Sequence, residues 1–231
     1  MTAIFITATG TDVGKTFVAA SLIGNFRQMG RVVEVIKPVV SGFDPTQAAT
    51  SDPGVLIKAL GVPVTPQAIE QISPWRFRAP LSPDLAARRE GQTIDVDEVI
   101  TFCQSAIDQR QDVLLIEGVG GVMVPLDDQR TILDVMMALR LPVILVAGSY
   151  LGTISHTLTA LDSLYRRDMN VIAIVVSETP GSTVPLDEAV SAISRFADPV
   201  IGLPRRRTPD RDLGGAAPFS RLLDPEGRRA R

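Results

Sequence analysis

The sequence predicts an α/β fold with a doubly wound, mainly parallel β-sheet and helices on both faces. Six short apolar runs alternate with helix-like segments, and each run is continuously apolar, as expected for strands covered on both sides. The 231 residues, 45% hydrophobic and 21% charged, are typical of one large globular domain. Strand–helix alternation of this kind predicts right-handed crossovers, with ligands bound beyond the carboxyl ends of the strands.

The expected strands and helices follow from the apolar runs and from the glycine and proline residues between them. Gly30 directly follows the first helical pattern and is expected to stop it. The expected strands are 3–6, 32–36, 113–116, 142–146, 171–176 and 200–201, and the expected helices are 15–29, 95–109, 132–139, 153–167 and 186–196. Residues 41–90 are rich in proline, and we expect irregular structure there with a short helical piece near 55–60.

We expect a single domain over residues 1–204 and a basic, loosely ordered tail over residues 205–231. A solvated terminus is favoured for the tail over a contact with acidic partners. The formal net charge of −3 argues against nucleic-acid binding. The only cysteine, Cys103, excludes an internal disulfide and is expected in a helix core. Without a leader-like segment or an apolar run near 18 residues, a cytoplasmic protein with no membrane contact is expected.

The segment Ala8–Thr16 has the layout of a P-loop, which makes the expected fold of the P-loop NTPase type. It lies between an expected strand and an expected helix and ends in Gly-Lys-Thr. Backbone N–H groups of such a loop and the helix N-terminus face one anion. Lys15 would reach the terminal phosphates, and the Thr16 hydroxyl would ligate Mg²⁺. The generic spacing needs a glycine where Thr9 stands, and Gly-Lys-Thr also occurs at ordinary helix starts; the flanking strand and helix favour the P-loop.

Lysine is rare in this chain, and two lysines follow expected strands. Lys15, Lys37 and Lys58 are the only lysines among 23 basic residues. Lys37, at the end of the second strand, is well placed to stabilise negative charge during phosphoryl transfer. The alternative is a surface lysine at a strand end.

Two acids also follow the pattern of a phosphate site. Glu117 ends an apolar strand and precedes Gly118-Val119-Gly120-Gly121, and an acid there costs desolvation unless it has a partner. In P-loop enzymes the acid at this place binds Mg²⁺. Asp52 precedes a short helix and is either a helix cap or a Mg²⁺ ligand.

Gly152-Thr153 opens a helix and is either an anion site or a simple turn with a threonine cap. His156, one turn further on, is expected to be a packed or surface residue and not a base. No His/Cys cluster suggests zinc, and no Ser-His-Asp arrangement is apparent.

Taken in order, these segments resemble the dethiobiotin synthetase family from about residue 3 to Pro204. The set is more specific than any single piece. The matching pieces are Val13-Gly14-Lys15-Thr16, Lys37-Pro38-Val39, Ser41-Gly42, Ser51-Asp52, Pro80, Ser82-Pro83, Glu117-Gly118, Gly120-Gly121, Leu141–Val146, Leu151-Gly152, Ile154 and His156.

The resemblance implies ATP- and Mg²⁺-dependent joining of CO₂ to 7,8-diaminononanoate, through a carbamate that attacks the γ-phosphate. ATP would be a co-substrate, and the enzyme would be a homodimer with active sites at the interface. The implied catalytic residues are Lys37 and Lys15. The implied nucleotide contacts are Asp12, Val13, Gly14, Lys15, Thr16, Phe17, Asp52, Glu117, Gly118, Val119, Gly120, Ser177, Glu178 and Pro204, the implied Mg²⁺ ligands are Thr16, Asp52 and Glu117, and the implied diamine contacts are Thr11, Ser41, Gly152 and Thr153.

The chain departs from the family pattern at several positions. The family loop usually begins with glycine where Ala8 stands and has aspartate where Gly10 stands. Ser155 replaces a usual asparagine, and Asp84 stands where many members carry histidine. Ser177-Glu178 replaces an Asn-Asp pair that reads adenine, so other triphosphates are alternatives to ATP.

Three other functions share parts of this pattern. Partition-type regulatory ATPases carry an extra lysine early in the loop, where this chain has Gly10. The corrinoid amidoligase relative normally has a fused glutaminase domain with a nucleophilic cysteine, for which this chain is too short. A non-enzymatic nucleotide-binding module is the third, and the two lysines and two acids argue against it.

Overall fold

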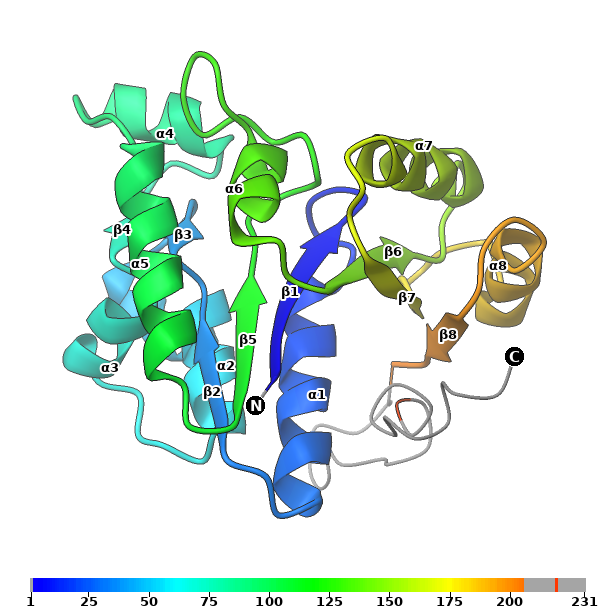
Figure 1. Ribbon diagram of the computed structural model, residues 1–231, viewed down its shortest axis with the longest axis horizontal. Helices are drawn as coiled ribbons and strands as arrows, with labels where there is room; N and C mark the ends of the chain where they lie inside the picture. Colours follow the sequence, from blue (N-terminus) through cyan, green and yellow to red (C-terminus); the bar gives the residue numbers. More distant parts are fainter. Residues whose placement is uncertain (1, 206–218, 220–231) are drawn as a thin grey trace.

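The computed structural model describes residues 2–205 and residue 219. Its main sheet has six strands in the order β2-β5-β1-β6-β7-β8, and every pairing in it is parallel (Figure 1). The strands are β1 (Thr2–Ala8), β2 (Val33–Ile36), β5 (Val113–Glu117), β6 (Val143–Gly148), β7 (Val171–Ser177) and β8 (Val200–Leu203). The six strands expected from the sequence and their parallel arrangement are therefore confirmed.

Five helices connect the strands of the main sheet close to the expected positions. Gly30 has φ +74°, and its N–H bonds the Arg27 carbonyl, so the first helix stops where the sequence indicates. The helices are α1 (Lys15–Gln28), α5 (Val96–Gln109), α6 (Ile132–Leu139), α7 (Thr153–Tyr165) and α8 (Leu186–Ile193).

Two apolar cores lie on opposite faces of the sheet. Phe5 of β1 belongs to the core that includes buried residues of α5, α6, α7 and α8, whereas its neighbours Ile4 and Ile6 belong to the core with α1. Side chains of a strand alternate between the two faces, so this split is direct evidence that both faces are covered (Figure 1). Cys103 is fully buried in the first core, as expected.

The expectation of irregular structure over residues 41–90 is wrong, although the short helical piece expected near 55–60 is present within a helix over residues 52–59. This segment contains η1 (Pro45–Thr50), α2 (Asp52–Ala59), α3 (Pro66–Ile72), α4 (Pro83–Arg89) and β4 (Trp75–Arg76), which pairs in parallel with β3 (Val39–Val40) in a small second sheet. Each of the four helical turns has a proline in its first two positions. Proline is tolerated there because its missing N–H would have no intrahelical partner. These four prolines therefore mark helix starts, whereas Pro63, Pro74 and Pro80 lie outside the helices.

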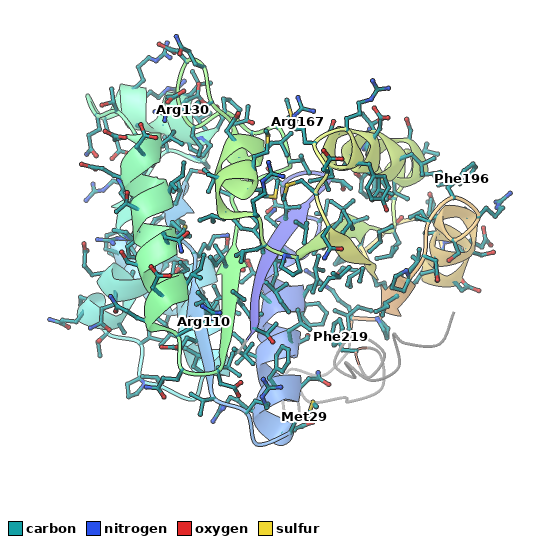
Figure 2. All side chains as sticks on the ribbon, in the orientation of Figure 1. Met29, Arg110, Arg130, Arg167, Phe196 and Phe219 are labelled. Atoms are coloured by element: carbon teal, nitrogen blue, oxygen red, sulfur yellow. The ribbon has the colours of Figure 1, made fainter. Side chains whose placement is uncertain are left out.

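Almost all of the expected tail lies outside the described residues. Phe219 is described, and it is fully buried in the core that contains α1 (Figure 2). Among the described residues, no helix is both long and apolar enough to cross a membrane.

Candidate active site

The loop between β1 and α1 has the backbone of an anion-binding turn. Asp12 and Gly14 have positive φ, at +57° and +99°, and Gly14 directly precedes the first helical residue, Lys15. A Cβ atom on Gly14 would lie 2.5 Å from Ser177 Oγ, so no side chain fits there without a shift. Ser177 at the end of β7 is thereby brought against the loop. The loop N–H groups and the α1 N-terminus lie together at this point.

Neither packing nor backbone conformation requires glycine at position 10 of the loop. A Cβ on Gly10 would meet no atom within 4 Å, and Gly10 is not among the residues with positive φ. The residue whose lack of a side chain allows a close approach is Gly121, because a Cβ atom on it would lie 3.2 Å from Gly10 N. Val122 N also donates to Ala8 O at 3.0 Å. The glycine segment after β5 therefore supports the loop backbone.

Lys15 is buried and its ammonium folds back onto the loop. Its Nζ donates to the Gly10 carbonyl at 2.9 Å. The pKa of Lys15 is lowered to about 8, mainly by burial and also by the nearby Lys37 ammonium, against the attraction of Glu117. An anion at this position would favour the charged lysine and so find a strong partner.

Lys37 is buried and not a surface lysine: its relative exposure is 2%. Its Nζ lies 2.5 Å from Glu117 Oε1, 3.0 Å from Asp52 Oδ2 and 3.4 Å from Gly118 O. Burial alone would lower the pKa of Lys37, but the carboxylates of Glu117 and Asp52 outweigh it and raise this pKa. Lys37 is therefore held as an ammonium.

Asp52 is not the cap of its helix. Ser51 is the N-cap of α2, and its hydroxyl accepts from Gly54 N at 3.3 Å. Asp52 is the first helical residue, and its carboxylate reaches across to Lys37. Partial burial opposes ionisation, but the Lys37 ammonium lowers the pKa of Asp52 below its ordinary value.

Glu117 is the most buried charged group of the site, with no exposed surface. Its Oε1 accepts from Thr16 Oγ1 at 2.7 Å as well as from Lys37, whereas its Oε2 has no hydrogen-bond partner in the described part of the chain. A buried carboxylate oxygen without a partner is costly. Together with the Thr16 hydroxyl and the Asp52 carboxylate, it supplies the oxygen donors that Mg²⁺ prefers.

These donors do not form an all-protein metal cage. Among the described residues, no group of three or more His, Cys, Asp or Glu side chains is arranged to hold a metal. Two carboxylates and one hydroxyl fit an ion that is shared with phosphate oxygens, which is the usual state of Mg²⁺ at nucleotide sites. The residues present therefore fit Mg²⁺ in company with a nucleotide.

A second region of the site follows β7 and β8. Glu178 N donates to Leu203 O at 2.9 Å, and Glu178 Oε2 accepts from Arg205 N at 2.8 Å. Glu178 and Pro204 line a shallow cavity of about 530 Å³, with Leu186 and Val190 as apolar walls. The structure thus brings Glu178 and Pro204 together next to Ser177, which itself lies against Gly14 of the P-loop.

The start of α7 is separate from the lysine–carboxylate cluster. Gly152, at φ +98°, is the N-cap, and Thr153 Oγ1 donates to Gly148 O rather than capping the helix, so the threonine-cap alternative is wrong. Within residues 2–205, no hydrogen bond joins Gly152 or Thr153 to Lys15, Lys37 or Glu117. Leu151 beside them is 88% exposed.

The remaining candidates differ in their surroundings. Thr11 is exposed, Ser41 is half-buried, and Phe17 packs against the α1 core. His156 is exposed, as expected, but its Nδ1 lies 2.8 Å from the Tyr150 hydroxyl, a partner that the sequence analysis missed. The i, i+6 separation of Tyr150 and His156 across a turn gives no periodic signal that could have revealed this pair.

Comparisons with known proteins find close relatives over most of this chain. A family model described as an AAA domain matches residues 2–206. The ATP-dependent dethiobiotin synthetase BioD of Caulobacter sp. (strain K31) is 51% identical over 86% of this chain and 85% of its own length. The protein of the same name from Methylobacterium nodulans is 46% identical over 85% of this chain and 90% of its own length.

The comparison with solved structures shows the fold alone. The MinC:MinD cell division protein complex of Aquifex aeolicus has a TM-score of 0.54 at 12% identity, covering 90% of this chain and 83% of that chain. The septum site-determining protein MinD of Pyrococcus horikoshii, complexed with Mg-ADP, has a TM-score of 0.51 at 17% identity, covering 88% and 81%.

Proposed function

Because this chain belongs to the ATP-dependent dethiobiotin synthetase family and is an ATP-dependent ligase, we propose that it closes the ureido ring of dethiobiotin from 7,8-diaminononanoate and CO₂. ATP is the co-substrate, and ADP and phosphate are released. The observation that carries the proposal is the buried cluster in which Lys37, Glu117 and Thr16 meet beside the P-loop.

The reaction has three steps. One amine of the substrate attacks CO₂ and loses a proton, which gives a carbamate. A carbamate oxygen attacks the γ-phosphorus and ADP leaves, which gives a carbamic-phosphoric anhydride. The neighbouring amine attacks the carbamoyl carbon and loses a proton, the carbon–oxygen bond to phosphate breaks, and the cyclic urea closes.

The two buried lysines supply positive charge for these steps. Lys15 would face the β- and γ-phosphates, because it follows the loop and is the first residue of α1. Lys37 would stabilise the carbamate and the transferring phosphoryl group, whose charge a buried ammonium offsets more strongly than one in water would. Thr11 and Ser41 would contact the diamine.

Thr16, Asp52 and Glu117 would hold Mg²⁺ together with phosphate oxygens. Bound there, the ion would neutralise charge that develops on the phosphates. Glu117 Oε2 supports this assignment, because it is a buried acceptor to which no group among the described residues donates.

The proposal also includes a homodimer in the cytoplasm with each site completed by the partner chain. Gly152 and Thr153 would receive the substrate carboxylate at the N-terminus of α7. The exposure of Leu151, and the lack of hydrogen bonds between this helix start and the lysine cluster of the same chain, support a role across an interface.

The direct test is phosphate release from MgATP, with and without 7,8-diaminononanoate and bicarbonate. We expect release to require both, with a cyclic urea detected by mass spectrometry. Lys37→Ala should abolish turnover and leave nucleotide binding largely intact, whereas Lys58→Ala, at an exposed lysine of α2, should change neither. Phosphate release that is indifferent to the diamine would refute the ligase proposal.

The interface can be tested by mixing two inactive variants. Lys37→Ala leaves the α7 start intact, and Gly152→Asp leaves the lysine cluster intact, so a heterodimer contains one complete site. At equal mixing we expect recovery of about a quarter of wild-type activity, from half of the dimers with one of two sites each. No recovery after subunit exchange would refute the shared site.

A further inference from the structure

Lys37 is the hub of the cluster through which the metal would be bound. Its Nζ contacts carboxylate oxygens of both acidic candidates, Glu117 at 2.5 Å and Asp52 at 3.0 Å, and approaches the Gly118 carbonyl at 3.4 Å. Thr16 Oγ1 donates to the same Glu117 oxygen. The ammonium therefore lies among oxygens that belong to the candidate metal ligands.

The charges of this cluster are balanced without any added ion. Two ammonium groups, Lys15 and Lys37, lie within reach of two carboxylates, Asp52 and Glu117. Three of these four side chains are buried, so an added divalent cation would bring uncompensated charge into a poorly hydrated place. A nucleotide brings several negative charges with it and removes that obstacle.

We propose that Lys37 occupies the cation position of the nucleotide-free enzyme, so that divalent metal enters only with the nucleotide and displaces the ammonium from Asp52. This inference rests on the proposed metal ligands. It assigns Lys37 a second role, which is to prevent metal binding when no nucleotide is present.

The two carboxylates differ in how strongly they hold the Lys37 ammonium. Glu117 ends β5, is fully buried and is also fixed by Thr16. Asp52 begins the short helix α2, and half of its side chain is accessible to solvent. The Lys37–Asp52 pair is therefore the weaker contact and the side from which an ion reaches the cluster. Once released from Asp52, the ammonium is free to turn toward the anionic reactants.

The test measures Mn²⁺ binding to the full chain by the enhancement of water-proton relaxation, without nucleotide and with a non-hydrolysable ATP analogue. The wild type should bind Mn²⁺ weakly alone and form a ternary complex with the analogue. Lys37→Met should tighten nucleotide-free Mn²⁺ binding on the order of tenfold or more, because two carboxylates lose their cation. Lys37→Arg keeps the charge and should remain weak, and Lys58→Met is the matched control for lysine loss.

A second readout uses the wild type alone and does not depend on variants that fold. With only three lysines in the chain, ¹⁵Nζ-labelled lysine should give few resolvable signals. The buried Lys37 signal should shift when Mg²⁺ and the analogue are added together and stay unchanged with Mg²⁺ alone.

The outcomes separate this inference from the proposed function. Two results would overturn the proposal that Lys37 occupies the cation position, and both would leave the metal ligands in place. One is equal Mn²⁺ affinity of the wild type with and without the analogue, and the other is a Lys37 signal that responds to Mg²⁺ alone. The absence of any ternary complex would overturn the metal assignment of the proposed function, and the inference with it.

Discussion

Gly10 and Gly14 lie in the same loop but differ in their tolerance of a side chain. Gly14 combines φ +99° with a contact at 2.5 Å from its would-be Cβ to Ser177 Oγ, and Gly10 has open space. We expect Gly14→Ala to lower the free energy of unfolding by about 1–3 kcal/mol and to weaken nucleotide binding. Gly10→Ala should stay within about 0.5 kcal/mol of the wild type. Urea denaturation and titration with a fluorescent nucleotide measure both; equal behaviour of the two variants would contradict the loop geometry.

The pKa of Lys15 makes nucleotide binding dependent on pH. In the free protein burial and the Lys37 ammonium lower it from 10.5 to about 8, and the phosphates of a nucleotide would raise it again. Near pH 8 we therefore expect binding to take up a proton and the dissociation constant to rise as the pH increases further. Calorimetry in buffers of different ionisation enthalpy measures this uptake, which Lys15→Arg should abolish. Proton release on binding would contradict the assigned shift.

The same shift has an opposite effect on folding. Between pH 8 and 10.5 the unfolded chain holds the Lys15 proton more tightly than the folded chain does. The contribution of Lys15 to the free energy of unfolding is therefore unfavourable below about pH 8 and is relieved as the pH rises through this window.

At the scale of single elements, the short helix α2 connects stability with the site. Its cap, Ser51, precedes the carboxylate that pairs with Lys37. Thr65 caps α3 in the same way, accepting from Ala68 N at 3.1 Å, but its helix does not carry a site residue. The two caps therefore form a matched pair.

We expect Ser51→Ala and Thr65→Ala each to lower the free energy of unfolding by about 1 kcal/mol. Only Ser51→Ala should also weaken binding of the metal–nucleotide complex, because it loosens the start of the helix that aims Asp52. Chemical denaturation and a nucleotide titration at saturating Mg²⁺ provide the two readouts. A binding defect in both variants would show a general loss of stability rather than a specific effect on α2.

At the scale of the whole molecule, the parallel sheet gathers the site. The ends of β1, β2, β5, β7 and β8 lead to the P-loop, Lys37, Glu117, Ser177 and Pro204 in turn. Parallel strands place all their carboxyl ends at one edge, so residues far apart in the chain converge there. Phe219, which follows the continuous described range 2–205 in the chain, adds to the apolar core that contains α1 (Figure 2).

Phe219 and Phe196 test this completion of the core. Phe219 has no exposed surface, and Phe196 is 65% exposed. We expect Phe219→Ala to lower the free energy of unfolding by about 3 kcal/mol or more, and Phe196→Ala to change it by about 0.5 kcal/mol or less. Thermal and urea unfolding of the two variants measure the difference. A neutral Phe219→Ala would refute its place in the core.

The sequence by itself determined the strands, the five helices that connect the strands of the main sheet, and the P-loop. Each depends on neighbours in the chain: apolar runs such as Val113–Ile116 set the strands, and Gly14-Lys15-Thr16 between strand and helix set the loop. Local patterns misled only where proline has two meanings, as at the starts of α2, α3 and α4.

The tertiary structure decided between the alternatives that the sequence left open. Lys37 is a buried partner of Glu117, which lies 80 residues away, and Asp52 is a partner of Lys37 rather than a cap. The support of the P-loop by Gly121 is likewise a contact between distant segments. Burial and ion pairing depend on which strand ends meet at the edge of the sheet, and local periodicity does not encode that meeting.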